Sequence, residues 1–152
     1  MLATSLIAAV TFWSPAPAGW TPDYLRALRE AKEQNKLVLV NFTGSDWCTF
    51  CKSLSKEIFN TDYFRKWAKE NVILLELDYP QGHRLPSYIE EQNAFVQSHY
   101  GVQTFPTVLL IEPNGRPYAK FGYAPMSPEQ WTSTVNTAII AYQNQNSKPA
   151  PG

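Results

Sequence analysis

The sequence predicts one α/β domain, in which helices cover both faces of a mixed β-sheet. Two segments, "KLVLVNF" at 36–42 and "VILLELD" at 72–78, are continuously apolar or nearly so, which is typical of strands buried on both sides. Helical patterns separate them, and this alternation favours parallel pairing. Further along, "PNG" lies between the apolar segments 108–111 and 118–123, which indicates an antiparallel hairpin appended to the parallel strands.

The remaining elements of the N-terminal half follow from caps and periodicity. Thr21 and Pro22 suit the cap and first residue of an amphipathic helix that ends near Asn35. Gly44 and Ser45 then end the first strand. We expect a helix to continue through "CKSLSKEIF" and a second short helix to cover "DYFRKWAKEN".

The C-terminal half is predicted in the same way. A loop over 79–86 leads into a helix over 87–100, with Gly101 as its left-handed stop. After the hairpin, Ser127 begins a capping box for a last helix that reaches about Tyr142. The residues from 144 to 152 are polar and rich in proline, so we expect a flexible tail.

Composition and charge restrict the function. With 44% hydrophobic and 14% aromatic residues, the 152-residue chain can bury a sizeable core without disulfides. Thirteen basic and thirteen acidic residues cancel, so no cationic field gathers nucleic acid or anionic lipid. Nucleic acid is therefore not an expected partner.

The first eighteen residues resemble a signal peptide. An apolar run, 6–13, is followed by Ala16-Pro17-Ala18, which suits cleavage after Ala18, although no lysine or arginine precedes the run. We predict a signal peptide over 1–18, a domain over 19–143 and a location in the periplasm or another extracytoplasmic space. The alternative is an apolar N-terminal strand or a disordered tail.

The only two cysteines, Cys48 and Cys51, are separated by two residues and have three interpretations. A stapling disulfide is unnecessary for a chain with this core. Zinc usually takes four ligands, and only His83 and His99 could join the cysteines. Redox chemistry fits best, because the first sulfur of C-x-x-C at a helix start gains thiolate stabilisation from the helix N-terminus. Cys48 is then the nucleophile, and Cys51, one turn further on, resolves the mixed disulfide.

Two motifs together resemble the thioredoxin superfamily: "VLVNFTGSDWCTFCK" at 38–52 and "YGVQTFPTVLLI" at 100–111. The segments "GSDWC", "EIFNTDYF" and "EPNGRPYAKFGY" are similar to its secreted branch of chlamydial-type periplasmic disulfide oxidoreductases. The resemblance extends from about Trp20 to Tyr142. It implies a thioredoxin-like fold and a redox-active Cys48–Cys51 disulfide that needs no other cofactor.

The resemblance also implies further site residues. Pro106 matches the cis-proline that packs against the active-site disulfide, and the backbone of Phe105 is then free to pair with an extended substrate. Without its companions, Pro106 would be read as an ordinary trans proline that begins a strand. Trp47 either offers substrates a flat apolar wall or is a half-buried core residue.

One position departs from the family pattern. Thioredoxins carry a buried aspartate on the strand before the cysteines, which helps to move the proton of the resolving thiol, and this chain has Asn41 there. An asparagine cannot act as that base. The available carboxylates are Glu57, Asp46 and Asp78. If none of them serves, either water takes the proton or resolution is slower.

These observations predict an exported thiol–disulfide oxidoreductase. Thr49 and Phe50 separate the cysteines without the histidine of strongly oxidising relatives, which favours a reductase or isomerase of disulfides in other exported proteins. The expected partners are those substrates and a membrane-embedded or other thiol electron donor. A disulfide-forming oxidase and a non-catalytic peptide- or metal-binding module are the competing hypotheses.

Overall fold

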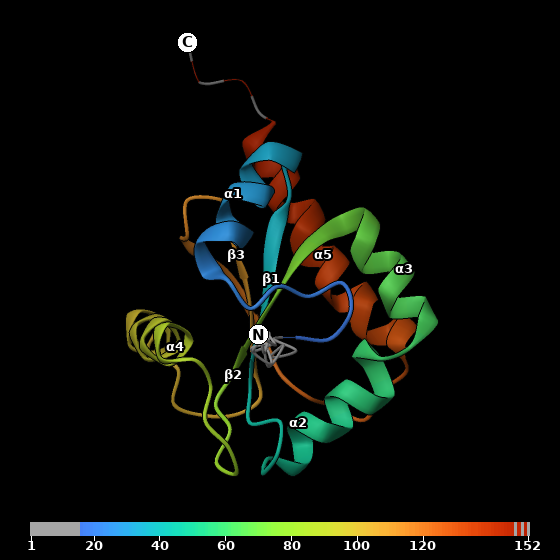
Figure 1. The fold of residues 1–152 in the computed structure, drawn as a ribbon. Coiled ribbons are helices and arrows are strands. Elements are labelled where there is room, and N and C mark those ends of the chain that lie inside the picture. The colour runs from blue at the N-terminus through green and yellow to red at the C-terminus, as the bar shows by residue number, and fades with distance from the viewer. Residues whose placement is uncertain (1–15, 148, 150, 152) are drawn as a thin grey trace, which may run out of the picture.

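The computed structural model describes residues 16–147, 149 and 151 (Figure 1). The predicted signal peptide therefore lies largely outside the described residues. In chain order the elements are α1 (Tyr24–Gln34), β1 (Leu37–Thr43), α2 (Thr49–Leu54), the π-helical η1 (Ser55–Phe59), α3 (Asp62–Asn71), β2 (Val72–Asp78), α4 (Ser87–Tyr100), β3 (Thr107–Ile111), β4 (Pro117–Phe121) and α5 (Pro128–Asn146).

The four strands form one mixed sheet in the order β2-β1-β3-β4. β1 pairs with β2 in parallel, while β3 pairs with β1 and with β4 in antiparallel fashion. The fully buried β1 occupies a central position, as its uninterrupted apolar sequence predicts. The predicted α/β fold class is confirmed.

Helices cover both faces of the sheet. In Figure 1, α1 and α4 lie on one side of the strands, and α3 and α5 lie on the other. Side chains alternate along a strand, so the even-numbered residues of β1 join the core beneath α1 and α4. The odd-numbered Leu37 and Leu39 join the core beneath α2, η1, α3 and α5.

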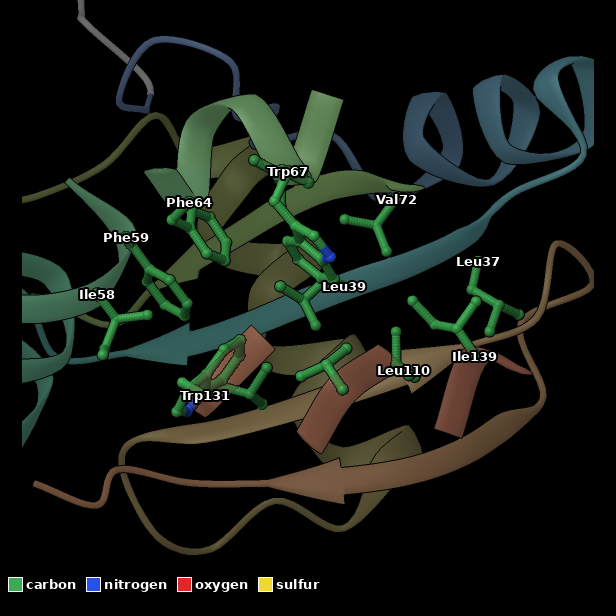
Figure 2. Close-up of a cluster of buried hydrophobic side chains, with 14 of the residues drawn as sticks. Leu37, Leu39, Ile58, Phe59, Phe64, Trp67, Val72, Leu110, Trp131 and Ile139 are labelled. Atoms are coloured by element: carbon green, nitrogen blue, oxygen red, sulfur yellow. The ribbon is translucent and has the colours of Figure 1, made fainter. Parts of the chain in front are cut away.

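The second of these cores is largely aromatic (Figure 2). Phe64 is fully buried, and its ring centroid lies 4.8 Å from that of Phe59, 5.6 Å from that of Trp67 and 6.1 Å from that of Trp131. Aromatic pairs at such separations contribute roughly 0.5–1.5 kcal/mol each beyond the burial of their area. This cluster fixes α3 and α5 against the sheet, and η1 with them.

Several predicted element ends are correct. Asn35 ends α1 in the left-handed region with φ 52°, and Gly101 ends α4 with φ 64°. Ser127 forms the expected capping box with Gln130. Each of these ends supplies partners for backbone groups that the helix leaves unpaired.

Two predicted ends are wrong. The cap of α1 is Asp23, whose carboxylate accepts a hydrogen bond from Arg26 N–H, because Thr21 forms a parallel bridge with Leu75 of β2 instead. The last helix continues to Asn146 rather than ending near Tyr142, so the first residues of the predicted tail are helical. Among the described residues, no helix is both long enough and apolar enough to cross a membrane.

Candidate functional site

The chain turns from the carboxyl end of β1 into α2 (Figure 1). Cys48 lies at the start of this helix and Cys51 lies within it. The carbonyl of Gly44 accepts hydrogen bonds from the N–H groups of Trp47, at 3.3 Å, and Cys48, at 2.9 Å. A Cβ atom at Gly44 would overlap the indole of Trp47, so only glycine permits this close approach. The turn delivers Cys48 to the N-cap position of α2.

Cys48 and Cys51 form a disulfide, and Cys51 is the more deeply buried, at 2% exposure against 6% for Cys48. Cys48 Sγ accepts a hydrogen bond from Cys51 N–H at 3.2 Å, and Gly44 N–H donates to Cys51 Sγ at 3.5 Å. In the dithiol form, a donor aimed at Cys48 and the start of the helix both stabilise a thiolate there. The geometry therefore suits the predicted roles of nucleophile and resolving thiol.

Aromatic side chains lie beside the cysteine turn. Trp47 is 39% exposed, its indole N–H donates to the carbonyl of Tyr79 at 2.8 Å, and its ring lies 5.7 Å from that of Phe105. The ring of Phe105 also lies 5.2 Å from that of Tyr79. The peptide bond from Phe105 to Pro106 is cis. The structure thus brings the Phe105–Pro106 segment beside Trp47, although 58 positions separate Trp47 from Phe105 in the sequence.

A second aromatic pair, which sequence reasoning missed, includes a residue between the cysteines. Phe50 is 61% exposed and stacks on Tyr123 with ring centroids 5.7 Å apart. The Tyr123 hydroxyl donates a hydrogen bond to Glu57 at 2.7 Å. We call the aromatic side chains beside the cysteines the aromatic rim. Its members are Trp47, Tyr79, Phe105, Phe50 and Tyr123. The signal in the sequence was an aromatic residue inside the C-x-x-C motif.

The three carboxylates proposed for proton handling are hydrogen-bonded to groups other than the cysteines. Asp46 accepts from the N–H groups of Gln81 and Gly82, and these bonds hold the pKa of its carboxyl below the ordinary value. Asp78 accepts from the backbone and hydroxyl of Ser45. Exposed Glu57 bonds to the aromatic rim. Asp46 and Asp78 thus join the cysteine turn to the end of β2 and the loop after it.

A different polar pair lies within the sheet. Asn41 is 2% exposed and stands opposite Glu76 in the parallel pairing of β1 and β2. Burial, and next the charge of Asp78, raise the pKa of Glu76 from its ordinary 4.5 to about 7, while hydrogen bonding from Asn41 opposes the rise. Sequence reasoning missed Glu76, although it is the one charged residue inside the apolar run of its strand.

The histidines do not join the cysteines. His83 lies 3.6 Å from Asp46, and the ring of His99 packs against Tyr100 at 4.7 Å. Within the described part of the chain, no three histidine, cysteine, aspartate or glutamate side chains gather as a metal site requires.

A mixed sheet with helices on both faces, and a C-x-x-C disulfide at the start of a helix, together define a thiol–disulfide oxidoreductase. The family assignment agrees with this class. The sequence model of the thioredoxin-like domain matches residues 24–139, and the chain belongs to this family.

Individual relatives give the same assignment. The chain is 29% identical to "Disulfide bond reductase DsbH" of Chlamydia pneumoniae over 116 residues, which cover 76% of this chain and 70% of that protein. It is 28% identical to "Thioredoxin-related protein DsbJ" of the same organism over 103 residues, covering 68% of this chain and 30% of DsbJ. A solved structure of "DsbH Oxidoreductase" superposes with a TM-score of 0.75 at 26% identity, covering 88% of this chain and 95% of that one. The predicted resemblance is confirmed.

Proposed function

We propose that this chain is an exported reductase of disulfides in other exported proteins. The observation that supports this direction is that, among the described residues, the hydrogen bond to the first sulfur comes from a neutral backbone N–H and not from a cationic side chain. Cys48 Sγ accepts a hydrogen bond from the backbone of Cys51, and the intervening Thr49 and Phe50 bear no charge. The side chain of His83 lies 3.6 Å from Asp46, and the side chain of Lys52 is exposed.

Thiolate stabilisation sets the direction of electron flow in this chemistry. A strongly stabilised thiolate makes the reduced enzyme stable and its disulfide oxidising, whereas a weakly stabilised thiolate makes the dithiol a good reductant. The backbone donor and the start of the helix stabilise the Cys48 thiolate less than they would if a histidine imidazolium were also nearby. The name of the Chlamydia pneumoniae relative, a disulfide bond reductase, supports the same direction.

The reaction transfers two electrons in two exchanges. The Cys48 thiolate attacks one sulfur of a substrate disulfide, forms a mixed disulfide and releases the first substrate thiolate. The Cys51 thiolate then attacks Cys48 Sγ, which forms the Cys48–Cys51 disulfide and releases the second substrate thiolate. A thiol donor must reduce the enzyme again, and for an exported protein a membrane-embedded electron carrier meets this requirement.

The aromatic rim gives the substrate a binding surface. Aromatic side chains offer a large contact area at low cost in conformational entropy. The Phe105 segment lies beside Trp47 of this rim, and an extended peptide can pair with its backbone as a short strand. We therefore expect extended segments with apolar residues near the disulfide to be the preferred substrates.

Export is supported by the position of the expected cleavage site. Pro17, Ala18 and Gly19 are exposed, while the next residue, Trp20, packs against Phe59 with ring centroids 5.0 Å apart. Cleavage after Ala18 would leave this packing in the mature chain. Expression of the full sequence in a bacterium that exports proteins, followed by N-terminal sequencing, should give a chain that begins at Gly19; an intact chain retained in the cytoplasm would contradict export.

The reduction potential tests the direction. Equilibration with glutathione buffers should give a value near the roughly −270 mV of thioredoxin, and a value near the roughly −120 mV of DsbA would indicate an oxidase. The reduced protein should also reduce insulin. Reactivation of scrambled ribonuclease without net insulin reduction would instead assign an isomerase.

The roles of the two sulfurs are tested by trapping. Cys51→Ser should accumulate mixed disulfides with substrate proteins, because Cys48 can attack but nothing resolves the product. Cys48→Ser should trap none. Equal trapping by the two variants would contradict the assigned roles.

A further inference from the structure

A largely buried polar pair lies on the face of the sheet that α2 covers. On this face the side chains of Leu37 and Leu39 of β1 and of Val72 and Leu74 of β2 form the aromatic-rich core. Side chains at every second position of a strand share a face, so Asn41 and Glu76 come next in these two series. They are partners in the register of β1 and β2.

The resolving cysteine faces the same side of the sheet. Cys51 and Leu54 are three residues apart on α2 and therefore share a helix face, and Leu54 belongs to this core. Cys51 Sγ also accepts the hydrogen bond from Gly44 N–H, three residues after Asn41. The polar pair and the resolving sulfur thus lie on one buried surface, at the end of the sheet where the redox chemistry occurs.

The pair has unused hydrogen-bonding capacity. Asn41 Oδ1 is buried and has no hydrogen-bond partner among the residues that the structure describes. A protonated carboxyl can donate to this oxygen, while the Asn41 amide can donate to an ionised one. Asn41 can therefore hold Glu76 in place in either protonation state.

Few other charges act on Glu76. Asp78 on the same strand raises its pKa further, and its partner on β1 is the neutral Asn41. The backbone N–H of Glu76 donates to the carbonyl of Thr21, and the charged residue nearest to Thr21 in that segment is Asp23, whose carboxylate caps α1 by accepting from Arg26 N–H. Every charged residue of α2, η1, α3 and α5 is exposed, including Lys52 and Glu57. The protonation state of Glu76 is therefore set by its burial, by the charge of Asp78 and by the hydrogen bond from Asn41. When the disulfide is reduced, the Cys51 thiol acts on it as well.

We propose that Glu76, positioned by Asn41, accepts the proton of the Cys51 thiol in the resolving step. Cys51 passes its proton to the Glu76 carboxylate, and the resulting thiolate attacks Cys48 Sγ, forms the intramolecular disulfide and expels the substrate thiolate. When a donor reduces the disulfide again, Glu76 returns the proton to the departing Cys51 sulfur. The proposal rests on the thiol–disulfide exchange proposed above, but not on its direction.

The chemistry of Glu76 matches this task. A buried thiol ionises reluctantly without a nearby base, and a general base works best with a pKa near the working pH. Burial raises the pKa of Glu76 to about 7, so both of its forms are populated near neutrality. The pair also explains how a chain with asparagine on β1 retains a carboxylate at this place, since the carboxylate comes from the neighbouring strand.

The test separates attack from resolution. Reduced protein is mixed with an equimolar amount of the chromogenic disulfide 5,5′-dithiobis(2-nitrobenzoate) in a stopped-flow instrument between pH 5.5 and 9. The first thiolate released reports attack by Cys48, and the second reports resolution by Cys51. In the wild type, the rate of the second phase should rise through an inflection near pH 7 as Glu76 loses its proton.

Two variants and a control decide the outcome. Glu76→Gln should slow the second phase by about tenfold or more at pH 7, remove the inflection and leave the first phase within about twofold, since general bases contribute at least this much. The double variant Asn41→Asp with Glu76→Gln, which moves the carboxylate across the register to β1, should restore rate and inflection. Glu70→Gln, an exposed carboxylate on α3, should behave as wild type.

Three results would overturn the proposal. They are an unchanged second phase in Glu76→Gln, a slowed second phase that keeps its inflection near pH 7, and a double variant that folds but regains neither rate nor inflection. Circular dichroism checks that each variant is folded. Because the assay uses no protein substrate, a chain that failed to reduce insulin would still report both phases, so failure of the proposed function is distinguishable.

Discussion

The raised pKa of Glu76 makes the stability of the fold depend on pH, and Glu76→Gln should remove that dependence. Below about pH 4.5 the carboxyl is protonated in both the folded and the unfolded chain, and burial costs little. Between about pH 4.5 and 7 the unfolded chain releases the proton while the folded chain retains it, so stability falls as pH rises. Above about pH 7 the carboxyl is ionised in both the folded and the unfolded chain, and the loss of folding stability stays constant.

The size of this effect follows from the two pKa values. They differ by about 2.5 pH units, each worth about 1.4 kcal/mol, so ionisation of Glu76 should cost the oxidised protein about 3 kcal/mol between pH 4.5 and 8. Glutamine has the same shape and no charge. The free energy of unfolding of Glu76→Gln, relative to wild type, should therefore rise by about that amount over this range.

Urea unfolding of the oxidised proteins, followed by tryptophan fluorescence at pH 4.5, 6, 7 and 8, measures the difference. Glu70→Gln, with its exposed side chain, is the matched control and should show a nearly constant difference from wild type. A difference between Glu76→Gln and wild type that is flat across the four pH values would refute the reasoning, because Glu76 would then ionise equally easily in both states.

Three other perturbations have definite expected outcomes. Phe64→Ala empties the centre of the aromatic core and should lower the free energy of unfolding by about 3–5 kcal/mol in urea titrations, whereas Tyr63→Ala, 45% exposed, should change it by less than about 1 kcal/mol. Asp46→Ala removes the acceptor of two backbone N–H groups in the loop after β2, so hydrogen exchange at these two amides should accelerate at least about tenfold; unchanged exchange would show that other contacts hold the loop. Phe50→Ala should reduce kcat/KM for insulin by about threefold to tenfold and leave reaction with the chromogenic disulfide unchanged; equal loss in both assays would argue against a substrate-binding role.

Much of the fold was predictable because its signals are local. The apolar runs of β1 and β2, the end of α1 near Asn35, the left-handed stop at Gly101 and the capping box at Ser127 each depend on a few consecutive residues. The start of α1 was not predictable in this way. Threonine is a common helix cap, but the backbone of Thr21 forms a β-bridge with a strand more than fifty residues away in the sequence.

The candidate site likewise combines residues with local sequence signals and residues whose contacts depend on the tertiary fold. The roles of Cys48 and Cys51 follow from spacing and from a helix start, both of which are local. The pairing of Asn41 with Glu76 depends instead on the register between two strands 35 positions apart, and a shift of one residue would place Glu76 on the opposite face. The contact of Phe50 with Tyr123 likewise requires the end of the hairpin to return to the cysteine helix.

The edges of the two outer strands of the sheet resist the addition of strands from other chains. Exposed strand edges are templates on which other chains add strands. On β2, Thr21 N–H donates to Leu74 and Thr21 accepts from Glu76 N–H, each at 2.9 Å, so the chain's own backbone occupies part of that edge. β4 begins with Pro117, which has no N–H, and carries the exposed Lys120. An extended substrate that pairs with the segment at Phe105, as proposed above, therefore meets two sheet edges that resist its permanent addition to the sheet.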